Sequence, residues 1–302
     1  MDNEIANLSG RTCVITGATS GIGRAAAREL SKTGVSLVLV GRKEEVGTRL
    51  AAELGRRPRS GQVTFLRADL SDQSQVRALA SAIAAKYPQV EILINNAGAR
   101  FNRYQRSLDG IELTFATNHL SHFLLTSLLL ERLHRSKEAR VITVASGAHR
   151  GAGANGPWLA EPEHYDRKLA YCQSKLANIL FASELARRMH KTAVVSNALD
   201  PGGVATNLGR NNGLLSWCRH LAYYALRREL LTPHQGAETV VFLAASPSVN
   251  GISGKYFCRK REVEPSTAAL DPQAAERLWS LSEAMTGLGA RVGAAEPSLD
   301  TV

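Results

Sequence analysis

The sequence lacks the features expected of a membrane-spanning or disulfide-bonded protein. No uninterrupted apolar run reaches the ~18 residues expected of a membrane span, and the opening MDNEIANLSG is too polar for a secretory signal. No two cysteines stand at CxxC spacing, which favours free thiols of a reducing compartment over a disulfide framework or a metal site. We therefore expect a cytoplasmic protein. The cysteines are Cys13, Cys172, Cys218 and Cys258.

Clustered basic residues and metal-ligand spacings are also missing. The net charge is +10, but Lys and Arg are dispersed and no aromatic-spaced basic run or zinc-finger pattern occurs. We expect no nucleic-acid partner. Strong salt dependence of binding would instead favour nucleic acid or a membrane as the main partner. A basic surface also suits a cofactor that carries several phosphates. His119, His122 and His149 show no metal-ligand spacing, so we predict local hydrogen bonding for them and no metal.

No Pro/Gly/Ser linker divides the chain. Strand-like runs alternate with helical patterns, and both sets are given by range at the end of this paragraph. The runs are rich in Val, Ile and Leu with little polar alternation, as in strands covered on both faces. The pattern predicts an α/β fold: one doubly wound, Rossmann-type parallel sheet of about seven strands with helices on both faces. We expect a single domain over 1–288 and a flexible tail over 289–302. The runs are 11–17, 35–41, 62–68, 91–97, 139–146, 193–200 and 254–258; the helical patterns lie at about 22–32, 44–54, 76–86 and 112–133, and around Tyr171.

A glycine-rich segment, TGATSGIGRA at 16–25, joins the first strand to the first helix. Gly17, Gly21 and Gly23 allow a tight turn and close approach of the backbone to a pyrophosphate, which the helix N-terminus attracts. Glycines also simply make turns, so the position after a strand is what strengthens this interpretation.

The end of the second strand predicts which nicotinamide cofactor binds. An NAD site would place an acid there for the ribose hydroxyls, but this chain has Gly41 followed by Arg42. A guanidinium suits a 2′-phosphate, and Arg24 adds a second positive charge. The alternative is that both arginines are ordinary surface residues. We favour NADP(H) over NAD(H).

Tyr171 and Lys175 lie four residues apart in LAYCQSKLAN and therefore share a helix face. A nearby ammonium favours the phenolate and lowers the phenol's pKa, which suits a proton donor near neutral pH. The competing interpretation is that Tyr171 packs on the sheet while Lys175 reaches water.

Together, several motifs resemble the short-chain dehydrogenase/reductase family over nearly the whole chain. The segments NHLSHFLLT and YCQSKLANILF, together with RLWSLSEAMTGL near the end, are most similar to the retinol-dehydrogenase-like branch. The motifs are TGATSGIG at 16–23, Asp69, NNAG at 95–98, TNHLSHFLLT at 117–126, VASG at 144–147, YCQSK at 171–175 and DPGGVATN at 200–207.

The resemblance implies a role for each matching residue. Tyr171 would be the catalytic acid/base, Lys175 its partner and a nicotinamide-ribose ligand, Ser146 the donor to the substrate oxygen, and Asn118 the holder of a water in the proton relay. The remaining cofactor contacts would be Gly17, Ser20, Gly21, Ile22 and Gly23 at the pyrophosphate, Asp69 and Leu70 at the adenine, Asn96, Ala97 and Gly98 under the adenosine ribose, and Pro201, Gly202, Val204 and Thr206 along the carboxamide.

Two departures from the family pattern affect the catalytic residues. Ala145 stands where many relatives in this branch have a second serine, which leaves Ser146 as the candidate. The segment between Ser146 and Tyr171 is long and contains Tyr165, which has no Lys four residues later and is the weaker candidate. Hydride addition builds charge on a carbonyl oxygen, and donors placed at that oxygen stabilise the transition state.

Residues 206–233 occupy the position of the family's variable substrate lid. Leu214, Trp217, Leu221 and Tyr224 recur at helical spacing there, which fits a lid over an apolar substrate, a helix resting on a membrane, or plain core packing. The residues that follow NNAG would shape the same pocket; they are Arg100, Phe101 and Tyr104.

The sequence therefore predicts an NADP(H)-dependent oxidoreductase that interconverts a carbonyl and an alcohol on a lipophilic small molecule. The alternative is a catalytically inactive NADP(H)-binding regulator on the same fold. Family members are often dimers or tetramers, and we take a homodimer as the expectation.

Overall fold

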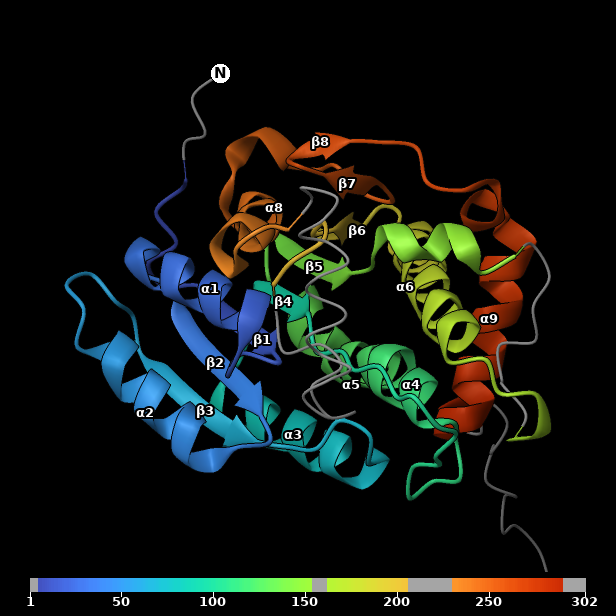
Figure 1. Cartoon of the computed structure of the whole chain (residues 1–302). Helices are drawn as coiled ribbons and strands as arrows, with labels where there is room; N and C mark the ends of the chain where they lie inside the picture. The colour runs from blue at the N-terminus through green and yellow to red at the C-terminus, as the bar shows by residue number, and fades with distance from the viewer. Residues whose placement is uncertain (1–4, 154–161, 206–229, 290–302) are drawn as a thin grey trace, which may run out of the picture.

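The computed structural model describes residues 5–153, 162–205 and 230–289. Their strands form one sheet in the order β3-β2-β1-β4-β5-β6-β7-β8 (Figure 1). The predicted doubly wound α/β fold is confirmed, but the sheet has eight strands rather than about seven. The strands are β1 Thr12–Thr16, β2 Ser36–Gly41, β3 Val63–Arg67, β4 Ile92–Asn95, β5 Ala139–Val144, β6 Val194–Asp200, β7 Tyr256–Cys258 and β8 Arg261–Glu262.

The strand missing from the prediction is β8, which pairs antiparallel with β7 while the other pairs are parallel. Arg259 and Lys260 join the two strands and both adopt positive φ, at 50° and 63°. Hairpin turns of this kind usually carry Asn or Gly, and β8 itself is short and charged. The sequence therefore contained neither a turn signal nor an apolar run at this place.

Helices cover both faces of the sheet (Figure 1). One face packs against α1, α2 and α8, and the other against α3, α5 and α6, with α9 lying outside α6. The prediction named neither α8 nor α9 as a helix. The helices are α1 Gly21–Leu30, α2 Glu44–Gly55, α3 Gln73–Lys86, α4 Leu113–Phe115, α5 Ser121–His134, α6 Arg167–Arg188, α8 Pro233–Ala245 and α9 Pro272–Thr286.

The helix predicted over 112–133 is interrupted by a wider turn. The Glu112 carboxylate caps α4 by accepting from the backbone N–H groups of Thr114 and Phe115, at 2.9 and 2.8 Å. A π-helical turn, η2 over Ala116–Leu120, then leads into α5. Such turns insert one residue into an α-helix and redirect side chains, often at functional sites.

The strand order creates a topological switch point between β1 and β4, the place where doubly wound sheets form a ligand crevice. β1 and β4 are neighbours, yet the segments that leave them pass to opposite faces. In doubly wound sheets, ligands bind outside the carboxyl ends of strands at such a switch point. The carboxyl ends of β1 and β4 lead into the glycine-rich segment and into NNAG, so the fold brings these two motifs together.

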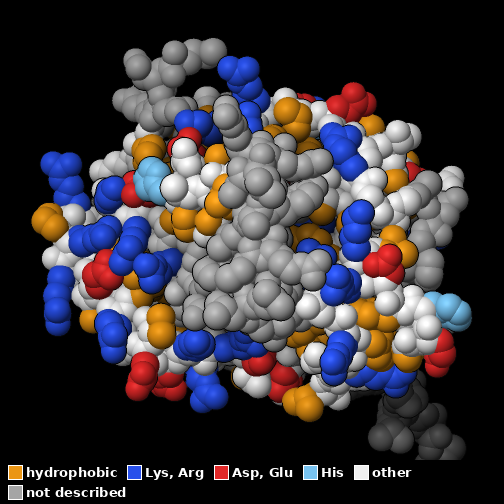
Figure 2. Space-filling model, viewed as in Figure 1, with side chains coloured by type: hydrophobic (Ala, Val, Ile, Leu, Met, Phe, Trp, Pro, Cys, Tyr) orange, Lys and Arg blue, Asp and Glu red, His pale blue; other side chains and the backbone are white. Residues whose placement is uncertain are grey.

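Parts of the predicted lid and tail lie outside the described residues, namely 206–229 and 290–302. At the end of the lid range, Leu231 forms a bridge with Val204, and α8 begins at Pro233. None of the described helices is long and apolar enough to cross a membrane. Within the described chain, no three His, Cys, Asp or Glu side chains are grouped to hold a metal ion. Lys and Arg side chains are spread over the face shown in Figure 2 rather than gathered in one patch.

Candidate active site

The turn between β1 and α1 fits an anionic group. Gly17 and Gly21 have φ values of +66° and +52°, where glycine is favoured. A Cβ at Gly23 would lie 2.5 Å from the Gly17 carbonyl oxygen, so α1 can start this close to the turn only with glycine there. Ser20 stands at the N-cap without a capping side-chain bond, and the first turn of α1 carries no acid. The helix N-terminus therefore offers its N–H groups to a pyrophosphate.

NNAG is fixed to that turn by hydrogen bonds. The backbone N–H groups of Asn96 and Ala97 donate to Thr16 Oγ1, at 2.9 and 3.0 Å. The Asn96 side chain also donates to the Thr16 carbonyl oxygen, at 2.8 Å. Gly98 continues the segment toward α6: a Cβ there would lie 3.6 Å from Lys175 Nζ. The glycine-rich segment and NNAG thus lie side by side along the predicted cofactor site.

The end of β2 carries Gly41 and Arg42 in place of a ribose-binding acid. A Cβ at Gly41 would lie 2.8 Å from Cγ2 of Thr19. Arg42 is exposed, and its guanidinium lies 3.9 Å from the Asp69 carboxylate. Leu70, beside Asp69, is buried. Arg24 is exposed on the first turn of α1. The predicted adenine-side residues therefore surround the carboxyl ends of β2 and β3.

Tyr171 and Lys175 lie on α6 and face the carboxyl end of β5. Lys175 Nζ is 5.9 Å from the centre of the Tyr171 ring and donates to the Val144 carbonyl oxygen at 2.9 Å. Lys175 is only 4% exposed. Burial lowers the pKa of Lys175 to about 8, and the Asp200 carboxylate acts in the opposite direction. The ammonium is thus held beside the phenol at a defined place.

Asn118 lies in the π-helical turn and is fully buried. Its side chain accepts from the Ala99 N–H at 2.7 Å and donates to the Ala99 carbonyl oxygen at 2.9 Å. It also donates to Ser174 Oγ at 3.0 Å, next to Lys175 in the chain. The Oδ1 of Asn118 would lie 3.5 Å from a Cβ at Gly98, the same atom that would approach Lys175. Asn118 and Lys175 therefore border the same small space.

Ser146 follows β5 and caps a short 3₁₀ helix, η3, over Gly147–Gly151. Its hydroxyl oxygen accepts from the Ala148 N–H at 3.2 Å, and η3 packs against α6. Ser146 thus projects from the end of the strand whose Val144 carbonyl holds Lys175. The structure brings Asn118, Ser146, Tyr171 and Lys175 to one region beside the carboxyl end of β5.

Tyr165, the weaker candidate, serves a structural purpose. Its hydroxyl donates to the Phe101 carbonyl oxygen at 3.1 Å and to the Glu112 carboxylate at 3.2 Å. Burial, with the Glu112 charge, raises the pKa of Tyr165 to about 12. Its ring packs edge-on against Tyr104, with centroids 5.7 Å apart. Near the other tyrosine, the Arg100 guanidinium lies 6.0 Å from the centre of the Tyr171 ring.

The nicotinamide end of the predicted site follows β6. The Asp200 carboxylate accepts from the Gly202 N–H at 2.9 Å and so builds the turn that contains Pro201. Gly202 has a φ of +82°, and Val204 is buried and bridged to Leu231. Thr206 lies outside the described residues.

Sequence reasoning assigned no role to two residues here, Asp200 and Ser174. The local hydrogen bonding predicted for His149 is present, since its Nδ1 lies 2.7 Å from the Ser146 carbonyl oxygen. A Cβ at Gly147 would lie 2.9 Å from the Asp200 carboxylate, which shows how closely that charge approaches the Ser146 turn. Asp200 could have been found from the sequence, because it stands directly before the turn of Pro201 and Gly202.

The family model for short chain dehydrogenases matches residues 11–214. The chain is a short-chain dehydrogenase. It is 39% identical over 293 residues to retinol dehydrogenase 14 of Mus musculus, an alignment that covers 93% of this chain and 87% of the relative. It is 40% identical over 283 residues to retinol dehydrogenase 12 of Homo sapiens, covering 93% and 88%. The retinol-dehydrogenase-like resemblance is confirmed, and this short-chain dehydrogenase is an oxidoreductase of alcohol and carbonyl groups.

Solved structures agree with this assignment. An uncharacterized protein from Mycobacterium Paratuberculosis superposes with a TM-score of 0.74 at 32% identity, covering 94% of this short-chain dehydrogenase and 96% of that chain. The RhlG/NADP active-site complex of Pseudomonas aeruginosa superposes with a TM-score of 0.68 at 25% identity, covering 85% and 97%. The family binds nicotinamide cofactors, and the glycine turn described above fits one.

Proposed function

We propose that this short-chain dehydrogenase uses NADP(H) to interconvert a carbonyl and an alcohol on a lipophilic substrate. The observation that carries the proposal is the buried Lys175 ammonium beside the Tyr171 phenol at the cofactor crevice. Bound NADP(H) supplies or accepts the hydride. Tyr171 gives the proton to the nascent alkoxide in reduction and takes it back in oxidation.

The neighbouring residues support that proton transfer. Lys175 is a fixed cation that favours the phenolate form of Tyr171. Ser146 donates a hydrogen bond to the substrate oxygen, where charge develops. Asn118 fixes Ala99 and Ser174 around the base of Lys175 and holds the relay water. These roles need a donor at the substrate oxygen and a cation beside the phenol; the proximity of Lys175 to the Tyr171 ring supports the second of them.

The preference for NADP(H) rests on the end of β2. A ribose 2′-phosphate needs a cation, Arg42 is exposed there, and Gly41 stands where an NAD site would carry its acid. Arg24 adds positive charge on the first turn of α1. The expectation of a lipophilic substrate rests on the apolar content of the lid range in the sequence and on the retinol dehydrogenase relatives.

The test follows NADPH and NADH oxidation against a panel of lipophilic aldehydes and ketones. Wild type should turn over with NADPH, and Tyr171→Phe should lose about 10²- to 10⁴-fold in kcat, the usual contribution of general acid catalysis. Tyr165→Phe is the matched control: its hydroxyl bonds to Phe101 and Glu112 rather than to the catalytic residues, so kcat should be retained and any loss should fall on KM. Tight NADPH binding without turnover of any carbonyl would favour the cofactor-binding regulator instead.

The cellular setting is a separate proposal. We expect a cytoplasmic homodimer that binds no nucleic acid. The alternative interpretation of residues 206–233 is peripheral contact with a membrane surface. The expectation of no nucleic-acid partner rests on the dispersed Lys and Arg residues of the sequence. Light scattering at several salt concentrations and vesicle flotation test these expectations.

A further inference from the structure

His149 is a buried titratable side chain that the proposed reaction does not use. It is 1% exposed and lies in η3, three residues after Ser146. Its hydrogen bonds join the catalytic serine to a distant segment of the chain. Because both ring nitrogens are engaged, the direction of each bond can be worked out from its partner.

The tautomer of His149 is set by a backbone donor. The Ser266 N–H lies 3.0 Å from Nε2 and can only donate, so Nε2 must hold a lone pair. In the neutral ring the proton is then on Nδ1, which lies 2.7 Å from the Ser146 carbonyl oxygen and donates to it. Burial, followed by the Arg150 charge, lowers the pKa of His149, against the opposing hydrogen bond to Ser146 and the Asp200 charge.

The Ser146 carbonyl oxygen thus receives two bonds from one residue. Besides Nδ1, the His149 backbone N–H donates to it at 3.1 Å. The backbone bond forms the 3₁₀ turn, whereas the ring bond ties that turn to Ser266, 117 positions further along the chain. The position of the Ser146 hydroxyl therefore depends on the imidazole as well as on β5.

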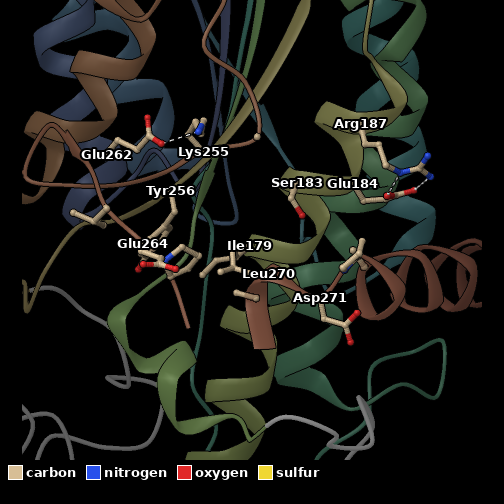
Figure 3. A pocket seen from close by; sticks show the side chains of 16 residues that line it. Ile179, Ser183, Glu184, Arg187, Lys255, Tyr256, Glu262, Glu264, Leu270 and Asp271 are labelled. Carbon is tan, nitrogen blue, oxygen red and sulfur yellow. Dashed lines mark hydrogen bonds and ion pairs between the residues drawn. The ribbon is translucent and has the colours of Figure 1, made fainter. Parts of the chain in front are cut away.

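The imidazole is held in turn by β7. Its ring packs edge-on against Tyr256, with centroids 5.2 Å apart. Tyr256 also lines a groove of about 590 Å³ between α6, the β7–β8 hairpin and the start of α9. Figure 3 shows the ion pairs Lys255–Glu262 and Glu184–Arg187 at this groove. The charged and titratable groups that face His149 are Asp200, Arg150 and Tyr256.

We propose that His149 is a positioning residue that holds Ser146 in place for the substrate oxygen, through its Nδ1–H bond to the Ser146 carbonyl and its Nε2 bond from Ser266. The role rests on the proposed function, because it acts through the catalytic serine. Two substitutions separate the two bonds. His149→Asn keeps an N–H near the place of Nδ1, while His149→Gln keeps an acceptor near the place of Nε2 and loses the bond to Ser146.

The experiment measures kcat, KM and the NADPH dissociation constant for these variants. His149→Gln should lose about 10- to 100-fold in kcat, the effect of a small misplacement of a catalytic group, with unchanged NADPH affinity. His149→Asn should recover most of the loss. In a Ser146→Ala background, His149→Gln should change kcat by less than about 2-fold, because there is no hydroxyl left to position. An equal loss in both backgrounds would overturn the proposal, since it would indicate packing alone.

A spectroscopic measurement decides the inference independently of turnover. Two-bond ¹⁵N–¹H spectra of labelled histidine, with His149 assigned by its absence in His149→Gln, should show the Nδ1–H tautomer at neutral pH. An Nε2–H tautomer or a charged ring would overturn the positioning role whatever the activity. Absence of carbonyl turnover in the wild type would instead contradict the proposed function, and the tautomer would still test the bond to Ser146.

Discussion

Lys175 carries its charge into a buried position, and the resulting cost in stability depends on pH. The pKa of Lys175 is about 8 in the folded protein, against an ordinary value of 10.5. Below pH 8 Lys175 is protonated in both the folded and the unfolded state, and the buried charge destabilises the folded state by its full amount. Between pH 8 and 10.5 the unfolded chain binds more protons than the folded one, so this contribution to stability rises with pH.

Lys175→Met removes that dependence. The difference in unfolding free energy between wild type and Lys175→Met should move in favour of the wild type by roughly 2 to 3 kcal/mol between pH 7 and pH 10. Denaturant titrations at each pH measure it, with both proteins in a Tyr171→Phe background, because the neighbouring phenol interacts with the Lys175 charge. Titrating groups that do not interact with Lys175 cancel in the difference. A difference in unfolding free energy that stays constant from pH 7 to pH 10 would contradict a depressed pKa for Lys175.

Arg42 is the residue on which the cofactor preference depends most directly. Arg42→Gln should weaken NADPH binding by about 10- to 100-fold, as expected for a lost hydrogen bond to a charged group, and leave NADH binding within about 3-fold. Fluorescence titration with both cofactors measures the change. Arg135→Gln, at an exposed arginine directly after α5, is the charge-matched control. Equal losses for both cofactors would argue against a 2′-phosphate contact.

At the scale of elements, α1 depends on glycine to approach the end of β1. Gly23→Ala places a methyl group 2.5 Å from the Gly17 carbonyl oxygen, so the turn must shift. We expect a lower melting temperature and loss of NADPH binding. Gly55→Ala in α2 is the control, because nothing lies within 4 Å of its Cβ; it should raise stability by about 0.5 to 1 kcal/mol. Retained cofactor binding in Gly23→Ala would contradict the tight turn.

Three of the predicted strands, β1, β2 and β5, are rich in Val, Ile and Leu. They are buried almost throughout, and burial on both faces of the sheet specifies them. β3 is only partly buried. Because parallel strands end at one edge, the motifs after β1, β4, β5 and β6 could be placed together before any coordinates. The site was predictable to that extent, and the matching motifs supplied the roles.

The features that the sequence did not reveal depend on single residues or distant partners. The π-helical turn inserts one residue into an apolar helix, which barely alters its periodicity. The bond between His149 and Ser266 joins positions 117 apart, so no local spacing predicts it. β8 depends on a turn of Arg259 and Lys260 that lacks the usual residues.

At the scale of the whole molecule, α9 closes the outer side of α6. Trp279 packs against Phe123 with centroids 4.9 Å apart and stacks on Phe181 at 6.0 Å. The Arg188 guanidinium covers the indole at 4.3 Å. In the same helix Ser282 Oγ lies within hydrogen-bond distance of His119 Nε2, at 3.0 Å. α9 therefore supports the helix that carries the Tyr171–Lys175 pair.

Trp279→Ala should lower the unfolding free energy by about 3 to 5 kcal/mol, the usual cost of deleting a buried large aromatic side chain. Leu270→Ala is the control, because that side chain is 53% exposed at the start of the same segment and should cost little. Urea denaturation followed by circular dichroism compares them. A small effect of Trp279→Ala would mean that α9 is not part of the cooperative core.

The short strand β8 has a consequence for how copies of this protein could meet. Sheets that end in a long apolar strand recruit further strands from other molecules, and natural proteins prevent this with short, charged ends. Here the sheet ends in Arg261 and Glu262, both exposed and turned antiparallel to the rest. β3 forms the other edge of the sheet. We therefore expect pairing of strands between molecules, and fibrous aggregation with it, to be disfavoured at the β8 end of the sheet.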